Sequence, residues 1–558
     1  MEGSWTMKNK QIMSERVRKA RKADAKPVLG AILAEEDNSD NPYGLCVGAD
    51  CYEWLLENYP RLILNVAFRN LFELIFLKHT LRDKKTNRIV ISNKALAICE
   101  GKKDAWKQNN YNGTALLTAF RDATGINIAW SRWVWRSADG KITGRARVIT
   151  NLGISDSLLS YIKKSICEEK QRYLNGRMQS SATIKEDYRL SLVRLERDNM
   201  LNYAVPEQQM IATMLKQAPM HKYITTVRDH RQEAVAEIER IQDENLGHDW
   251  TGTRGKDAQE RLLMQIVAQP KPLYHPVQHS YRLFGNGLAI IDRRVRRALT
   301  PGWPELDLKG AHVAIASAKW PIPELNERLR GGLSIWPYLL DYLEVEDQFR
   351  KRMKQVVKQA TYAALYGTFG SDLDRKLWEL RDDEFRDLKP WQRPYFKKQL
   401  VDCDIIQLIL QARDAEMERA FNDWGTETPF GWLSLMVDIQ TNELCEILPF
   451  ETQKTHLSHA ASAYELKLMV PCFEAASRMS KDVTITLLQH DGLSLAVRPS
   501  RLEHVISAMQ AAVQDVADEY DIPTLLEVEE DKAHGLACCE AQAGRTPTAE
   551  LEATNCPL

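Results

Sequence analysis

One stretch, TITLLQHDGLSLAV at 484–497, has the pattern of a β-hairpin with a charge at its turn. Apolar residues fill most of both halves, and His490, Asp491 and Gly492 separate them. Glycine permits a tight or bulged turn between antiparallel strands. A carboxylate at the centre of an apolar hairpin needs compensation, because burying an unpaired charge is costly. A divalent cation shared with a second carboxylate would supply that compensation.

The second carboxylate that we expect is Asp307, in the segment PGWPELDLKGAHVAIASAKW at 301–320. Residues 303–308 resemble a strand, and the Ala-rich residues after Gly310 resemble a helix. A carboxylate at a strand end can bind a hard metal ion through oxygen. Taken alone, however, this segment favours Asp307 as the N-cap of the following helix. The metal site is therefore predicted from Asp307 and Asp491 together.

A helix face that is both cationic and aromatic is predicted in RKRMKQVVKQATYAALYGTFG at 350–370. Lys354, Lys358, Tyr362 and Tyr366 recur every four residues, so they share one face. Two lysines at this spacing repel each other unless an anion lies beside them. A triphosphate would satisfy both, and a base or sugar could stack on the rings. The alternative is a solvated face with aromatic anchors.

Together these residues fit nucleotidyl transfer assisted by two Mg²⁺ ions, for which Mn²⁺ could substitute. Asp307 and Asp491 would hold both ions. One ion would lower the pKa of a primer hydroxyl, and the other would neutralise the pyrophosphate. Lys358 would bind the phosphates or donate a proton to the pyrophosphate, and Tyr366 would test the sugar and base of the incoming nucleotide.

In order and spacing, these motifs resemble motifs A, B and C of the family A DNA polymerases. Asp307 matches the strand-borne Asp of motif A, and Lys358 begins a Lys–seven residues–Tyr-Gly pattern that is similar to motif B. His490-Asp491-Gly492 stands where motif C has His-Asp-Glu. The resemblance covers about 277–535. It implies an α+β fold of the right-hand polymerase type, with an antiparallel palm sheet, helical fingers and a helical thumb.

The same resemblance implies several DNA contacts. The segment HLSHAASAYELKLMVPCF at 456–473 looks like the family's late palm helix, with His459 where a template-contacting Gln is usual. Arg282, in SYRLFGNG, stands where the family has a minor-groove Arg. Gly367 and His490 complete the set of residues that the resemblance places against DNA.

Three positions depart from the family pattern. His312 replaces the Glu that blocks a ribose 2′-hydroxyl, so sugar selection stays open. Gly492 replaces the motif C Glu, which phage-type single-subunit RNA polymerases also lack. Lys354 replaces an Arg and supplies charge without a bidentate fork. Tyr362 occupies a position that is aromatic in the DNA polymerases, which favours deoxynucleotides. The predicted nucleotide-binding residues are therefore Lys354, Lys358, Tyr362, Tyr366 and His312.

Composition separates the two ends, the N-terminal region and the charged helices from the rest of the chain, and the resemblance implies the thumb, palm and fingers, which gives seven parts. They are a basic flexible N-terminus (1–40), an N-terminal accessory domain that makes an α/β extension (41–185), thumb-like helices (186–276), palm with motif A (277–345), fingers with motif B (346–440), palm with motif C (441–535) and a disordered tail (536–558). The thumb-like helices are expected to be long and protruding, with thin apolar seams.

The accessory domain has two interpretations. A helix at 114–124 precedes two strand-like stretches, 126–135 and 145–150, that flank a Gly-rich turn with basic residues. This order is typical of a winged-helix unit, but an ordinary α+β element with a solvated hairpin is favoured. The region has no carboxylate constellation that we can assign to a proofreading exonuclease, so no proofreading is predicted.

The chain of 558 residues has a formal net charge of −1, so a nucleic-acid partner must meet local basic patches. No stretch is apolar for about 18 residues, so no membrane partner is expected. The basic N-terminus lacks the apolar run of a secretory signal. We expect a cytoplasmic monomer, associated with a nucleoid or encoded by a phage or plasmid. Its partners would be primer-template DNA, dNTPs and replication accessory proteins.

The function that these observations favour is a template-directed DNA polymerase that adds deoxynucleotides to a primer 3′ end. A primase-like or single-subunit RNA polymerase relative is an alternative, favoured by His312 and Gly492. A non-catalytic replication-initiator DNA-binding protein is another. The presence of both Asp307 and Asp491 argues against this last alternative.

Overall fold

The computed structural model describes twelve stretches of the chain. They are residues 45–78, 89–102, 111, 113–136, 142–153, 155–197, 200–244, 255–277, 280–386, 388–435, 450–489 and 491–528. The predicted basic N-terminus (1–40), the predicted tail (536–558) and His490 lie outside these residues. Among the helices of the described stretches, none is long and apolar enough to cross a membrane.

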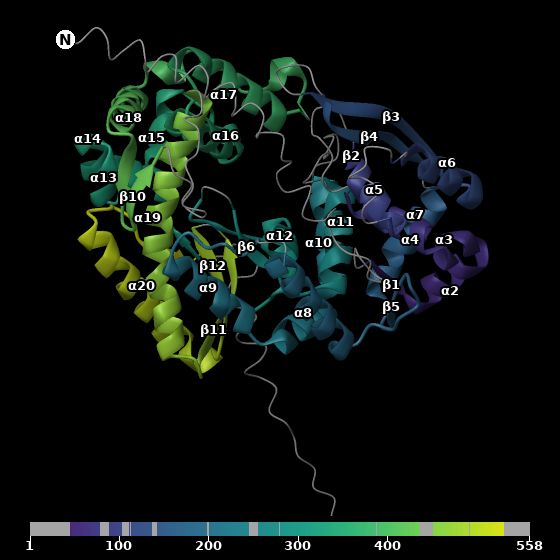
Figure 1. Ribbon diagram of the computed structural model, residues 1–558. Coiled ribbons are helices and arrows are strands. Elements are labelled where there is room, and N and C mark those ends of the chain that lie inside the picture. Colours follow the sequence, from purple (N-terminus) through teal and green to yellow (C-terminus); the bar gives the residue numbers. More distant parts are fainter. Residues whose placement is uncertain are drawn as a thin grey trace, which may run out of the picture.

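A four-stranded antiparallel sheet lies at the centre of the C-terminal half. Its strands, in the order β11-β12-β8-β13, are Val483–Gln489, Gly492–Val497, Glu305–Leu308 and Leu526–Val528. The β11–β12 hairpin confirms the strand pairing that the sequence predicts around Asp491. Two long helices, α19 (Phe450–Arg478) and α20 (Leu502–Glu519), pack beside the sheet and share its apolar core (Figure 1).

A second core lies among the helices between β8 and α19. These helices are α13 (Ala311–Lys319), α14 (Pro323–Arg330), α15 (Ile335–Tyr342), α16 (Asp347–Leu365), α17 (Gly370–Glu384) and α18 (Asp404–Asn422). On α16, Met353, Val356, Val357, Ala360 and Ala364 are buried at helical spacing, so one face joins this core and the other stays free for polar groups. A short hairpin of β9 (Gly425–Thr428) and β10 (Gly431–Ser434) links α18 to α19.

The helices that precede the central sheet differ in part from their prediction. They are α8 (Ser181–Arg197), α9 (Pro206–Gln217), α10 (Met220–Glu244), α11 (Lys256–Ala268) and α12 (Arg293–Leu299), with β6 (Tyr274–Pro276) and β7 (Leu283–Gly285) between α11 and α12. Val227, Ala234, Ile238 and Ile241 form the expected apolar seam of α10. The expectation of a protruding helix is wrong for α11, which is buried along most of its length. The physical reason is that α11 packs in one core with the N-terminal elements.

The N-terminal part of the chain is a mixture of helices and strands, on the right of Figure 1. Its elements are β1 (Cys46–Gly48), α2 (Ala49–Asn58), α3 (Pro60–Leu64), α4 (Val66–Lys78), β2 (Ile89–Ser92), α5 (Asn93–Cys99), α6 (Gly113–Thr124), β3 (Asn127–Arg136), β4 (Ile142–Gly153), α7 (Asp156–Lys164) and β5 (Gln171–Tyr173). Strands β2, β4 and β3 form an antiparallel sheet in that order, and β1 pairs with β5. Five 3₁₀ turns complete the description: Ser165–Cys167, Gly287–Ala289, Pro390–Gln392, Leu400–Asp402 and Pro499–Arg501.

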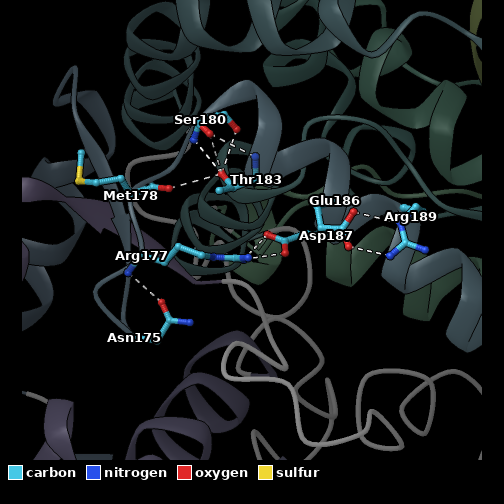
Figure 2. A network of polar contacts seen from close by, with 8 residues as sticks. All are labelled: Asn175, Arg177, Met178, Ser180, Thr183, Glu186, Asp187 and Arg189. Atoms are coloured by element: carbon cyan, nitrogen blue, oxygen red, sulfur yellow. Dashed lines mark hydrogen bonds and ion pairs between the residues drawn. The ribbon is translucent and has the colours of Figure 1, made fainter.

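Polar contacts secure the start of α8, where the N-terminal part passes into the helices before the sheet (Figure 2). The backbone N–H of Ser180 donates to Thr183 Oγ1 at 2.8 Å, and the N–H of Thr183 donates to Ser180 Oγ at 3.2 Å. This reciprocal pair satisfies backbone donors that the helix itself leaves unbonded. Arg177 then donates to both carboxylate oxygens of Asp187 at 2.6 Å, which joins the preceding turn to the second turn of α8.

Candidate active site

The central sheet brings Asp307 and Asp491 together. Strand β8 pairs with β12 so that Asp307 lies directly opposite Gly492, the residue after Asp491. The backbone N–H of Leu308 donates to the carbonyl oxygen of Asp491 at 2.9 Å. The N-cap role that the local sequence favours for Asp307 is wrong. Helix α13 begins at Ala311 after Gly310 in the left-handed region (φ 59°), so Asp307 belongs to the strand instead.

The structure explains why a glycine occupies position 492, which the neighbouring sequence does not reveal. A Cβ atom at this position would lie 2.9 Å from Asp307 Oδ1 and 3.0 Å from the carbonyl oxygen of Leu306. Any side chain at position 492 would therefore displace the Asp307 carboxylate or the strand beneath it. The glycine leaves room for the Asp307 carboxylate beside the turn that carries Asp491.

Both carboxylates have a raised proton affinity. Burial raises the pKa of Asp307 to about 7, the negative charge of Asp491 adds to that rise, and Lys358 opposes it. Burial, followed by the negative charge of Glu465, raises the pKa of Asp491, and Lys358 again acts in the opposite direction. A pair of buried, repelling carboxylates is the arrangement that a bound divalent cation stabilises.

The raised pKa of Asp307, caused by burial and then by the charge of Asp491, makes the stability of the metal-free protein depend on pH. The folded-state pKa of Asp307 lies above the value of 3.8 expected for a free side chain. The free energy of unfolding therefore falls as pH rises from that value through about 7, because the folded state must release a proton that it holds tightly. In EDTA, Asp307→Asn is expected to melt a few degrees above wild type at about pH 8, with a smaller gap at about pH 5.5. Thermal unfolding at both pH values measures this gap, and an equal gap at both would contradict the assignment.

Helix α16 presents the predicted cationic and aromatic face to this pair. Lys358 lowers the pKa of both carboxylates, and its Nζ lies 5.6 Å from the centroid of the Tyr362 ring. Burial and the charges of Asp491 and Asp307 raise the pKa of Tyr362, so its hydroxyl stays protonated. Lys354 lies one turn earlier and is exposed. The structure thus brings Lys358 and Tyr362 to the carboxylates and leaves Lys354 at the rim.

A polar cluster lies beside Asp491. Arg282 donates to both carboxylate oxygens of Glu465, at 2.7 and 2.9 Å, and Arg282 Nη2 lies 3.0 Å from His312 Nε2. The other ring nitrogen of His312 contacts the Tyr366 hydroxyl. Burial lowers the pKa of His312, so the ring is neutral and only one of its two nitrogens carries a proton. The cluster therefore fixes both His312 and Tyr366, two of the predicted nucleotide-binding residues.

The sequence analysis missed Glu465, which is 2% exposed on α19. The signal was present: Glu465 is an acidic residue within the mostly apolar run Ala460–Val470 of a helix. Such a residue needs a partner when buried, but the periodicity of the helix does not say which one. That partner, Arg282, lies 183 residues earlier in the chain and was predicted to contact DNA.

The remaining predicted DNA contacts are spread around the site. Gly367 follows α16 with φ 118°, a conformation that side chains rarely adopt. His459 is half-buried on α19, where its carbonyl oxygen accepts from Ser462 Oγ at 2.7 Å. The DNA contacts of these residues, and of Arg282, stay predictions.

A third acidic residue of the sheet is not available to a metal ion. Glu305 precedes Asp307 by two residues on the same strand face, but Arg296 and Arg297 donate to it at 2.7 and 2.9 Å. Burial acts to raise the pKa of Glu305, and these arginines bring it below its usual value. Within the described stretches, no group of three or more His, Cys, Asp or Glu could hold a metal ion. A Mg²⁺ ion is nevertheless commonly held by one or two carboxylates together with substrate phosphates and water.

A cavity of about 580 Å³ opens next to His312 and Tyr366. Its walls come from α13, α18, the β9–β10 hairpin and α19, and they mix acidic, basic and aromatic side chains. Lys319 forms part of the far wall, where its Nζ donates to the Tyr520 carbonyl at 2.7 Å. Neither Asp307 nor Asp491 lines this cavity, which is large enough for part of a nucleotide.

No protein-family model matches the chain, and no curated protein matches it. Among solved structures, the chain is similar to the POL domain of Pol1 from M. smegmatis in complex with DNA primer-template and dNTP. The sequence identity is 13% and the TM-score is 0.34, over 53% of this chain and 54% of that one. The chain thus spans about half the length of that solved chain, and it is a helix-rich α+β protein with a weak structural resemblance to a polymerase domain.

Proposed function

We propose that this protein is a template-directed DNA polymerase that transfers deoxynucleotides to a primer 3′ end. One observation carries the proposal: Asp307 on β8 lies beside Asp491 at the β11–β12 turn, and the positive charge of Lys358 on α16 lowers the pKa of both. Two adjacent carboxylates with raised proton affinity suit divalent cations, and an amine close to both suits a triphosphate. The order of the three sequence motifs supports the same reaction.

The residues present fit a pair of Mg²⁺ ions. Asp307 and Asp491 would hold them, and the ions when bound would supply an activated primer hydroxyl and charge neutralisation at the pyrophosphate. Lys358 would bind the triphosphate and hold a proton for the leaving pyrophosphate. The edge of the Tyr366 ring, fixed through His312 and Glu465, would limit where the incoming sugar and base can lie.

Primer extension by the purified full chain in Mg²⁺ tests this function. The expected result is template-dependent extension with dNTPs and none without a primer. A primer-free product, or a strong preference for rNTPs, would instead favour the primase-like or RNA-synthesising alternative. His312 and Gly492 motivate that comparison, because both depart from the family A pattern. If the wild-type protein extends no primer with either sugar, the non-catalytic alternative is favoured.

Lys358 gives a second test of the site. Lys358→Ala is expected to lower kcat for dNTP addition about a hundredfold, because the variant loses a charge and a proton donor at the leaving group. Lys376→Ala, on the exposed surface of α17, is the matched control and should leave kcat within about twofold. Single-turnover extension separates this chemical effect from DNA release. Equal rates for the two variants would remove Lys358 from the mechanism.

A further inference from the structure

The N-terminal elements are arranged in the order of a winged-helix domain. Helix α4 is followed by β2, α5, α6, β3 and β4, and the three strands pair antiparallel in the order β2-β4-β3. In helix-turn-helix proteins of this kind, the last helix enters the major groove and the hairpin after it contacts the flanking backbone. The element order therefore favours the winged-helix interpretation over the ordinary α+β element that the sequence favoured.

Charge distinguishes this segment from the rest of the chain. Residues 66–153 contain 16 Lys and Arg against 6 Asp and Glu, a net charge of +10, whereas the whole chain has −1. Counting only the described residues of this segment, 9 Lys and Arg face 3 Asp and Glu. A strongly basic module in an otherwise acidic protein is the electrostatic pattern expected of a surface that meets phosphates.

A buried arginine joins the last helix to the sheet. Arg147 on β4 is 6% exposed; its Nε donates to Thr114 Oγ1 on α6 at 3.1 Å and its Nη1 to Asn93 Oδ1 on α5 at 3.3 Å. Arg132 on β3 lies directly opposite Arg147, so its side chain leaves the sheet on the same side. Arg132 is exposed. An exposed cation therefore stands beside α6, on the side of the sheet that α6 covers.

On the outward face of α6, the side chains that would enter a DNA groove are small and uncharged. Ala115 and Ala119 are exposed one turn apart, with Thr118 half-buried between them, while Leu116, Leu117 and Phe120 face the core. Small side chains on this face allow a close approach to base edges. Arg121 at the end of the helix is exposed, and its Nε donates to the exposed Asp122 at 3.0 Å. Figure 1 shows α6 and the β3–β4 hairpin at the outer edge of the molecule, away from α19 and α20.

We propose that α6 and the β3–β4 hairpin form a second nucleic-acid site, which binds double-stranded DNA independently of the Asp307–Asp491 centre. The occupant is a duplex, because a helix and an adjacent hairpin match a groove with its two flanking phosphate backbones. The elements from α4 to β4 are held against the preceding and following helices. Arg261 of α11 donates to the Phe76 carbonyl of α4 at 3.0 Å, and both helices share one apolar core. Binding at α6 would therefore hold the whole protein on the duplex.

The test uses the full chain and a closed dumbbell duplex of about two helical turns, which has no 3′ end for the polymerase site. Fluorescence anisotropy gives its Kd at about 50 and about 200 mM salt. Ala119→Glu and Arg132→Glu are each expected to raise Kd about threefold to tenfold, and together more. Arg132→Glu should also lower the salt slope of log K by about one. Ala511→Glu on α20 and Arg478→Glu at the end of α19 are the matched exposed controls and should bind as wild type.

Two results would overturn the proposal. One is a double variant, Ala119→Glu with Arg132→Glu, that binds the dumbbell as tightly as wild type while circular dichroism shows both to be folded. The other is a wild-type protein that prefers a single strand of the same length to the dumbbell. Neither readout needs nucleotide transfer, so failure here is distinguishable from failure of the polymerase function. At saturating DNA, the double variant should extend a primer with an unchanged kcat.

Discussion

Asp307→Asn and Asp491→Asn are each expected to lower primer extension about a thousandfold or more, because each removes one of two carboxylates that would hold the metal ions. The Asn side chain has the shape of Asp and lacks its charge. Asp307 lies opposite Gly492, next to the turn that carries Asp491, so the double variant should lose little more activity than either single variant. The measurement is single-turnover extension in Mg²⁺.

Asp515→Asn, on the exposed face of α20, is the matched control and should retain wild-type activity. Calorimetric titration with Mg²⁺ gives a readout that does not depend on turnover: the wild type should bind, and each site variant should bind more weakly. Full activity in either Asp307→Asn or Asp491→Asn would remove the two-carboxylate mechanism. Loss of activity with unchanged Mg²⁺ binding would move that aspartate out of the metal site.

Glu465→Ala is expected to destabilise the protein by about 3–5 kcal/mol, the usual effect of breaking a buried ion pair. Glu465 is 2% exposed and Arg282 only 20%, so the variant leaves a guanidinium in the interior without its carboxylate. His312 also loses a contact at 3.1 Å. Urea unfolding measures the change in free energy of unfolding.

Glu474→Ala, exposed on the same helix, should cost less than about 0.5 kcal/mol. The double variant Arg282→Met with Glu465→Leu should regain most of the lost stability, since apolar side chains of similar volume often replace a buried ion pair without loss. A cost for Glu465→Ala no larger than that for Glu474→Ala would mean that the pair contributes nothing to folding. Stability recovered without restored extension would show that the cluster contributes to extension beyond its effect on folding.

Local patterns were sufficient for the elements that carry the site. The apolar runs on either side of Asp491 predict a hairpin, and the structure has β11 and β12 there. The four-residue spacing of Lys358, Tyr362 and Tyr366 predicts a shared helix face, and α16 with its C-cap has it. These predictions succeed because the periods of strands and helices are properties of neighbouring residues.

Local patterns failed where contacts with distant segments of the chain determine the structure of a residue or helix. The sequence around Asp307 favours an N-cap, and only the pairing of β8 with β12 makes it a strand residue that faces Asp491. The charged composition of 186–268 favours protruding helices, but contact with the N-terminal core buries α11. In both cases a tertiary contact outweighs a preference that is worth only a fraction of a kcal/mol per residue.

By itself, the sequence singled out the candidate site residues, two aspartates, a lysine and two tyrosines, and it specified the hairpin and the helix that carry all of them except Asp307. Only the tertiary structure decided which other residues contact these side chains. It showed that Gly492 leaves space for the Asp307 carboxylate, and that Glu465 joins Arg282 and His312. The physical reason is that buried charges and close backbone approaches are satisfied across the fold, by residues that no local period brings together.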